Sequence, residues 1–272
     1  MNDLKPWLDD LYSRFNDRRF VSPDPLASLF RYDNVCDREI AAVLAAGLAY
    51  GNVKSIVASV EKLFARLGPS PRKFVEENSL REMMKRIGDF RHRWTTTDEV
   101  VNLLSAFHAV CVERGSLGDA LRMKIATDDE DIQPALILWH RELVAAGLDV
   151  SNSLLADPSK SSASKRTHLF LRWMVRCDAV DPGGWDISPR LLLMPVDVHI
   201  HRIAKCLRFT RRRAADLKTA REITRSFRKL SPDDPVKFDF ALTRLPLREG
   251  VRGDALMRRL ARRETREPKS EN

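Results

Sequence analysis

Asp197 stands where a helix is predicted to begin. Pro195 lacks an amide hydrogen and resists a place inside a helix, so a new element is expected just after it. A carboxylate at such a start accepts hydrogen bonds from the free amides of the first turn and meets the positive end of the helix dipole. Asp197 falls on the inward side of an apolar stripe formed by Ile200, Ala204 and Leu207. Two interpretations are open: an ordinary helix cap, or the acid of an active site.

Lys165 shares this anomaly at the start of another predicted helix. It lies four residues before Leu169 and eight before Trp173, on the apolar face that those two residues define. Ser164 precedes it as the expected N-cap. A lysine on a buried face is unusual, although a lysine in a first turn often extends its ammonium group to water.

Together the two residues suggest a nucleophilic amine beside a carboxylate. Near a helix start and among arginines, the Lys165 amine is expected to be partly neutral, so it could attack an electrophilic carbon and form a Schiff base. Asp197 could stabilise a sugar cation while the bond at the anomeric carbon breaks. That is base-excision chemistry at a nucleotide, and it requires the base to leave the stack. Spacing alone favours the structural interpretation of both residues, a cap and a solvated lysine.

The segment from Val196 to His201 also alternates as a strand would. Asp-x-His-x-His on a strand puts both histidines on one face, as metal hydrolases built on barrels require. On a helix, residues two apart point in nearly opposite directions and cannot bind one ion. Because the apolar stripe continues through Leu207, we predict a helix here and no metal site.

The other elements that position these residues are also predicted to be helices. Apolar residues recur at helical spacing along the chain, and proline, glycine or asparagine separates the runs. Asp37 is the expected cap of the second helix, and residues 151–164 form a serine-rich, hairpin-like loop. We find no convincing strand alternation and no internal repeat, so the predicted fold class is all-α. The predicted helices cover residues 4–19, 37–48, 56–67, 71–77, 79–87, 97–111, 117–126, 132–146, 165–177, 198–207, 218–230 and 235–245.

Composition limits the classes of protein to consider. The 272 residues are 43% hydrophobic and 31% charged, which is ordinary for a folded domain, and the net charge of +9 favours a polyanionic partner such as nucleic acid. We predict one all-α domain over residues 1–250 with two helical subdomains, and a basic, flexible tail over residues 251–272. We also expect no membrane segment, a cytoplasmic protein associated with the nucleoid, and a monomer. The four cysteines are too widely spaced for a zinc knuckle and fit thiols in a reducing compartment: Cys36, Cys111, Cys177 and Cys206.

A resemblance to a known family rests on the residues around Asp197. The run Pro195-Val196-Asp197-Val198-His199, followed by Arg202-Ile203-Ala204, resembles the segment with the catalytic aspartate in helix-hairpin-helix DNA glycosylases, 8-oxoguanine glycosylases in particular. Those enzymes carry a lysine at the start of a preceding helix, just after a hairpin, and the serine-rich loop before Lys165 looks like the counterpart. The separation of 32 positions is similar to that in archaeal 8-oxoguanine glycosylases. Residues 164–166, 170–176 and 180–185 are also similar to a bacterial family of unknown function in the same superfamily, and that likeness extends from about Asp37 to Leu245.

The resemblance implies two helical subdomains with an active-site cleft between them, and double-stranded DNA as the partner. It implies Lys165 as the Schiff-base nucleophile, Asp197 as the carboxylate, His199 at a phosphate-side position and Asn52 as a residue that wedges into the duplex. It implies no metal and no organic cofactor. The chain lacks the usual Leu-Pro-Gly-Val-Gly hairpin that grips the DNA backbone, and no cluster of four cysteines follows the core, which excludes the iron–sulfur branch.

The remaining candidates have simpler alternatives. Lys160, Arg166 and Arg202 could bind phosphate, and each could equally be a solvated charge. Trp173 could stack on an everted base, but it lies on an apolar stripe as a core residue does. The expected function is a DNA glycosylase and AP lyase that acts on an oxidised purine such as 8-oxoguanine. The alternative is a non-catalytic DNA- or RNA-binding protein of the same fold, with a metal-dependent hydrolase as a third possibility.

Overall fold

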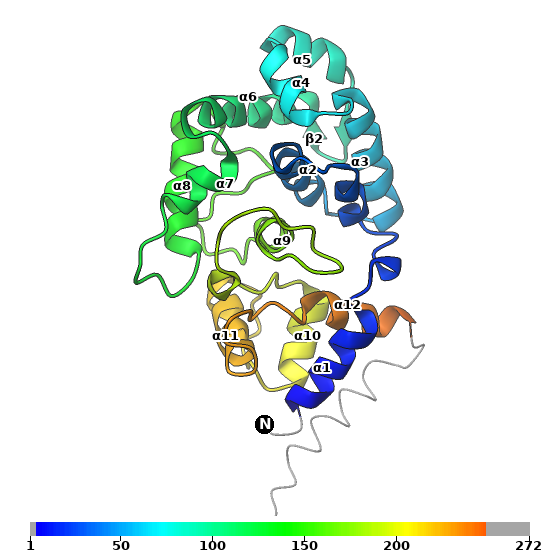
Figure 1. Cartoon of the computed structure of the whole chain (residues 1–272), viewed down its shortest axis with the longest axis vertical. Coiled ribbons are helices and arrows are strands. Elements are labelled where there is room, and N and C mark those ends of the chain that lie inside the picture. Colours follow the sequence, from blue (N-terminus) through cyan, green and yellow to red (C-terminus); the bar gives the residue numbers. More distant parts are fainter. Residues whose placement is uncertain (1–3, 249–272) are drawn as a thin grey trace, which may run out of the picture.

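The computed structural model describes residues 4–248, and its fold class is all-α (Figure 1). The predicted tail at 251–272 lies outside the described residues. In the first half of the chain the helices are α1 (Leu4–Phe15), α2 (Val35–Gly47), α3 (Val53–Leu67), α4 (Pro71–Glu77), α5 (Leu80–Ile87), α6 (Thr97–Arg114) and α7 (Leu117–Arg122). In the second half they are α8 (Gln133–Ala145), α9 (Lys165–Val175), α10 (Val198–Cys206), α11 (Leu217–Arg228) and α12 (Asp239–Arg248). Short 3-10 turns lie at Arg18–Phe20, Pro25–Arg31 and Pro189–Leu191.

A small β-hairpin corrects the expectation that the chain contains no strands. Strands β1 (Arg91–His92) and β2 (Thr95–Thr96) pair antiparallel between α5 and α6. Two-residue strands are too short to show an alternating apolar pattern, so periodicity could not reveal them.

Side-chain caps set several of the helix starts, although one predicted cap is wrong. Asn34, and not Asp37, caps α2 by accepting from the amide of Cys36. Asp37 instead reaches across to α4, where its carboxylate accepts from the Ser70 hydroxyl at 2.6 Å and the Arg72 amide at 2.9 Å. A carboxylate at a helix start stabilises the free amides there, so the Asp37 side chain contributes to the start of a neighbouring helix.

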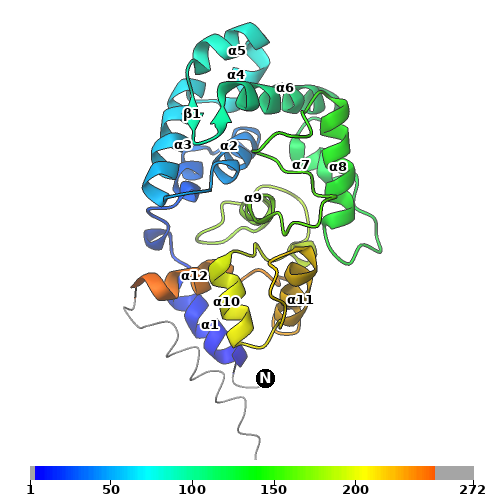
Figure 2. The ribbon, with the colours of Figure 1, turned by 180° about the vertical axis from the view of Figure 1, so that it is seen from behind.

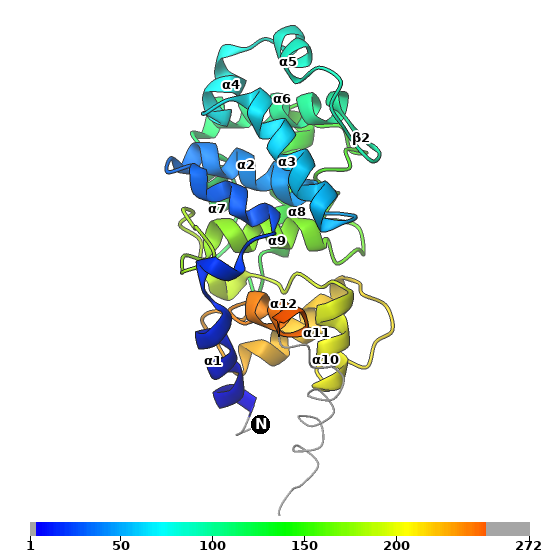
Figure 3. The ribbon, with the colours of Figure 1, turned by 90° about the vertical axis from the view of Figure 1, so that its right-hand side faces the viewer.

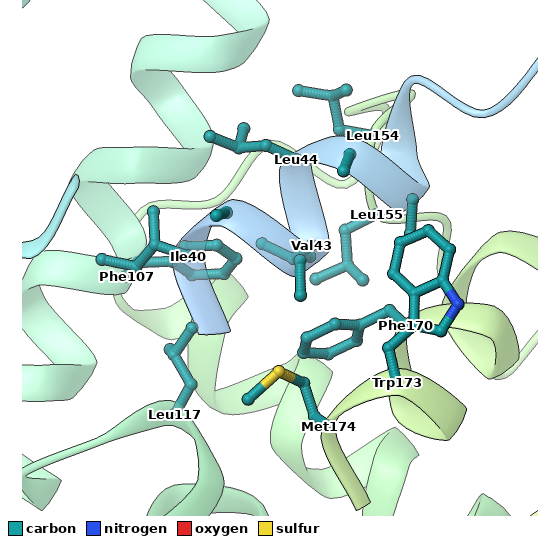
Figure 4. Close-up of a cluster of buried hydrophobic side chains, with 14 of the residues drawn as sticks. Ile40, Val43, Leu44, Phe107, Leu117, Leu154, Leu155, Phe170, Trp173 and Met174 are labelled. Carbon is teal, nitrogen blue, oxygen red and sulfur yellow. The ribbon is translucent and has the colours of Figure 1, made fainter. Parts of the chain in front are cut away.

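The first hydrophobic core fills the larger part of the molecule. It collects buried side chains from all the helices α2 to α9, with Phe107 and Trp139 among the largest that are fully buried. The alanine-rich α2 packs against α9, and Figure 4 shows Ile40, Val43 and Leu44 of α2 above Phe170 and Met174 of α9. Small residues in α2 allow these two helices to approach closely.

A second hydrophobic core gathers the two ends of the described chain. Its buried residues come mainly from α1, α10, α11 and α12 (Figures 1 and 3). In all three ribbon views α9 lies between the helices of the two cores. The N-terminal helix α1 therefore joins its core from the far end of the sequence, by packing against α12. Within residues 4–248, no helix is long and apolar enough to cross a bilayer.

Candidate active site

Asp197 is the N-cap of α10, as the sequence predicts. Its Oδ1 atom accepts from the backbone amides of His199 and Ile200, each at 2.9 Å. The helix continues with Ile200, Ile203 and Ala204 buried in the second core, so the segment is a helix and not a strand. His199 and His201 consequently point in different directions, and His201 lies against the carbonyl of Arg212 at 3.1 Å.

Lys165 is the first residue of α9, and the structure brings it to Asp197. The Lys165 Nζ atom lies 4.0 Å from the Asp197 Oδ2 atom, across 32 residues of sequence. The two side chains are 33% and 26% exposed, so solvent reaches both of them. Asp197 therefore uses one carboxylate oxygen as a helix cap and turns the other towards the amine. The two interpretations offered for this residue are compatible.

The pair lies where the two hydrophobic cores meet. The apolar face of α9 belongs to the first core, whereas the apolar face of α10 belongs to the second. Close to the pair is Asp239, the buried first residue of α12, which forms an ion pair with Arg172 of α9. Burial raises the pKa of Asp239; the charge of Arg172 opposes this shift and the charge of Asp197 adds to it. A second carboxylate thus lies close enough to influence the site.

Ser164 does not cap α9 with its side chain, although the sequence predicts that it does. It occupies the N-cap position in the left-handed region, with φ 42°, and its side chain makes no capping hydrogen bond. Its hydroxyl is buried and has no partner among the described residues. The first amides of α9, beside the Lys165 amine, are therefore not capped by this serine.

The serine-rich loop before α9 contains no helix, as predicted, and part of it is fixed by contacts with the second core. The carbonyl of Ser161 accepts from the amide of Leu217 at the start of α11, at 2.9 Å, and Ser162 forms an isolated bridge with Asp216. Lys160 in this loop is exposed. The loop therefore reaches the second core just before the chain enters α9.

Arg166 contacts protein groups and is not a free surface charge. Its guanidinium donates to the carbonyl of Gly47 at the end of α2, and it lies 5.1 Å from the centre of the Tyr50 ring. A cation at a helix C-terminus offsets the negative end of the dipole. His199 and Arg202 are exposed on α10 and remain available to an external ligand.

Asn52, the candidate for a residue that wedges into the duplex, has a structural role as a helix cap. It is exposed, and its side chain caps α3 by accepting from the amide of Lys54 at 2.9 Å. Two residues earlier, Tyr50 contacts Arg166 and so connects this turn to the start of α9.

Trp173 does not form part of an accessible base pocket, which corrects that candidate role. The residue is 1% exposed and belongs to the first core, where Figure 4 shows it beside Phe170. A base stacked from outside would have to displace buried side chains. The apolar stripe in the sequence already favoured this alternative.

Two groups of residues near the site were not predicted. One is a buried ion network between α9 and the second core: Arg172, Arg176, Asp178, Asp181, Asp234 and Asp239. The spacing of four between its two arginines places them on one side of α9, and this is the signal that could have indicated it. The other is the hairpin turn Arg93-Trp94, for which the sequence offers no clear signal.

Comparison with known proteins identifies a family but no activity. Residues 24–248 match the family described as "Protein of unknown function (DUF2400)", and the chain belongs to that family. No curated protein and no solved structure matches the chain. Within residues 4–248, no three His, Cys, Asp or Glu side chains are grouped so that they could hold a metal ion.

Proposed function

We propose that this protein is a DNA glycosylase with AP lyase activity, which removes an oxidised purine such as 8-oxoguanine from duplex DNA. The observation that carries the proposal is the 4.0 Å separation of the Lys165 amine and the Asp197 carboxylate, with both side chains partly exposed. The resemblance around Asp197 and the net charge of +9 support a DNA substrate. We place the everted nucleotide in a cleft between two glycosylase-type subdomains, each built on one hydrophobic core.

The first chemical step breaks the glycosidic bond. Lys165 transfers a proton to Asp197, and the free amine attacks C1′ of the damaged nucleoside. The bond from C1′ to N9 breaks, and the purine leaves with the bonding electrons and takes up a proton. Asp197 donates the proton it received from Lys165 to the departing purine, and the carboxylate that this reforms stabilises the positive charge on the sugar.

The second step cuts the DNA strand and regenerates the free enzyme. Opening of the sugar ring gives a protonated Schiff base between Lys165 and C1′. Loss of a proton from C2′ then expels the 3′ phosphate by β-elimination. Water hydrolyses the Schiff base and regenerates the amine, so no co-reactant other than water is required.

Borohydride trapping tests this mechanism directly. Borohydride reduces a Schiff base to a stable amine, so the native protein should become covalently attached to a duplex that contains 8-oxoguanine. Lys165→Gln should abolish the adduct, because it removes the nucleophile and keeps a side chain of similar length. Lys85→Gln is the matched control, since Lys85 is an exposed lysine on α5 outside the candidate site, and it should leave the adduct in place. An adduct that persists in Lys165→Gln, or none with the native protein on any damaged duplex, would contradict the proposed chemistry.

The alternative is a DNA- or RNA-binding protein of the same fold without the chemistry. One observation favours it: Asp197 already has a structural task as the cap of α10. This alternative predicts salt-sensitive binding that survives both Lys165→Gln and Asp197→Asn, with no release of base from any lesion.

A further inference from the structure

The turn of the β-hairpin carries an exposed tryptophan in an unusual position. Arg93 and Trp94 form the two-residue turn between β1 and β2, and Arg93 has left-handed backbone, with φ 56°. Turns of this kind favour glycine, asparagine or aspartate, so an arginine followed by a tryptophan is an unfavourable choice for the turn itself. Trp94 is nevertheless 58% exposed. A large apolar surface kept in water at a disfavoured turn suggests a role in binding.

The tryptophan is held in one orientation by Tyr50. The two rings are stacked, with centroids 4.8 Å apart and planes inclined by 15°. The Tyr50 hydroxyl donates to the carbonyl of His92 at 2.7 Å, and it lies 2.7 Å from the hydroxyl of Thr95. His92 in turn contacts the Tyr50 carbonyl through its Nε2 atom at 3.1 Å. The stacked pair is therefore fixed on both strands before any ligand arrives.

Positive charge surrounds the stacked rings. The Arg93 guanidinium lies 4.8 Å from the Trp94 ring centre, and the Arg166 guanidinium lies 5.1 Å from the Tyr50 ring centre. Gly51 leaves room for this arrangement, because a Cβ atom there would approach Arg93 Nη1 to 2.9 Å. Aromatic faces beside guanidinium groups are the combination that binds unpaired bases and their phosphates.

The rings are also connected to the candidate active site. Arg166, which contacts Tyr50, directly follows Lys165 in α9. Figures 2 and 3 place the hairpin and α10 on the same side of the molecule. A DNA molecule bound at Lys165 and Asp197 would thus meet the hairpin turn on the same face.

We infer that Trp94, supported by Tyr50, is a stacking platform for an unpaired base of the DNA bound at the Lys165–Asp197 site. The inference rests on the proposed function, since eversion of one nucleotide is what leaves a neighbouring or opposite base without its partner. Each base stacked on an aromatic side chain contributes enough to change affinity by about tenfold or more. Trp94 binds in this scheme and does not take part in bond breaking.

The test is the affinity for a duplex that contains a tetrahydrofuran abasic site, which the enzyme cannot cleave. Trp94→Leu keeps an apolar side chain but removes the aromatic face, and it should raise Kd for this duplex about tenfold, with a smaller effect on an intact duplex. Leu80→Ala is the matched control, because Leu80 is another exposed apolar residue, on α5, and its removal should leave Kd unchanged. Thermal unfolding of each variant shows whether its fold is intact.

The outcomes separate this inference from the proposed chemistry. If the native protein gives no borohydride adduct but Trp94→Leu weakens abasic-site binding, the platform stands and the lyase mechanism fails. If the adduct forms and Trp94→Leu binds both duplexes like the native protein, the platform is wrong and the mechanism stands. Equal weakening on abasic and intact duplexes, or no DNA binding by the native protein, would also overturn the platform.

Discussion

At the scale of single residues, Asp197 has a structural task and, in the proposed mechanism, a chemical one. Its Oδ1 atom caps α10, and its Oδ2 atom faces the Lys165 amine. Asparagine is as good an N-cap as aspartate but carries no charge, whereas alanine provides neither the cap nor the charge. Substitutions at this position can therefore separate the two tasks.

We predict that Asp197→Asn folds with nearly native stability but forms the borohydride adduct at least about 100-fold more slowly, because proton transfer and charge stabilisation are lost. Asp197→Ala should in addition lose about 1 kcal/mol of unfolding free energy with the cap. Urea unfolding and the initial rate of trapping measure the two effects. If Asp197→Asn is trapped at the native rate, Asp197 acts only as a helix cap and the proposed chemical role is wrong.

Lys165 and Asp197 could be identified from the sequence because each is an ionisable residue on the apolar face of its own predicted helix. An ionisable residue that opens a helix on the apolar side can be recognised from periodicity alone, and both Lys165 and Asp197 met that condition. The failure at Ser164 has a different origin. Residue type suggests a cap, but the backbone at Ser164 turns into the left-handed region, and that conformation depends on how the loop packs against α11.

At the scale of elements, α9 carries a buried imidazole, that of His168, three residues after Lys165. His168 is 1% exposed, and neither of its ring nitrogens has a hydrogen-bond partner among the described residues. Burial lowers its pKa from 6.5 to about 4; the charge of Asp131 opposes this shift and that of Arg221 adds to it. The folded protein therefore holds His168 neutral where the unfolded chain would protonate it.

The sign of the resulting pH effect follows from proton binding. As pH falls below 6.5 the unfolded chain binds a proton at His168 and the folded chain does not, so the unfolding free energy decreases until pH reaches about 4. Over this window the loss amounts to about 3 kcal/mol. We predict that His168→Leu is at least as stable as the native protein at pH 7 and loses less stability between pH 7 and pH 4.5.

Urea unfolding at the two pH values checks this prediction. His199→Gln is the control, because it removes an exposed imidazole from the neighbouring helix α10 and should leave the decrease in place. The same decrease in His168→Leu as in the native protein would show that another group causes the acid sensitivity.

Most helices could be predicted because they are amphipathic, and the exceptions have physical reasons. The predicted helix at 71–77 has the same bounds as α4. In contrast, α1 ends at Phe15, four residues before the predicted end of the first helix. The predicted helix at 235–245 begins later, at Asp239, where the carboxylate is buried against Arg172. The hairpin of β1 and β2 depends on contacts from Tyr50, far away in sequence, and no local pattern reports such contacts.

At the scale of the whole molecule, the two cores are joined by buried charges. The Asp181 carboxylate is fully buried and accepts from the guanidinium groups of Arg172 and Arg176 at the end of α9. Arg172 also pairs with Asp239 of α12, and Arg176 with Asp234 just before that helix. The Tyr12 hydroxyl on α1 donates a hydrogen bond to the Asp178 carboxylate at 2.8 Å. The network therefore holds α9, which belongs to the first core, against the helices of the second.

Removing one carboxylate from this network should be costly and should uncouple the cores. Asp181→Ala leaves two buried guanidinium groups without a shared partner, and such a change destabilises proteins by about 3 kcal/mol or more. Asp89→Ala is the control, because Asp89 also pairs with an arginine, Arg66, but its side chain is 95% exposed. Exposed pairs contribute little, so this variant should unfold like the native protein.

The two cores can be followed separately during unfolding. Trp139, Trp173 and Trp185 are buried in the first core, whereas Trp7 packs against the second. With Trp7→Phe as the common background, tryptophan fluorescence reports mainly on the first core, and circular dichroism reports on the helices of both. We predict coincident urea transitions for the native protein and for Asp89→Ala. In Asp181→Ala the circular dichroism signal should begin to change at lower urea than the fluorescence, since the second core loses its connection to α9. Coincident transitions at the native midpoint in Asp181→Ala would show that apolar contacts alone couple the two cores.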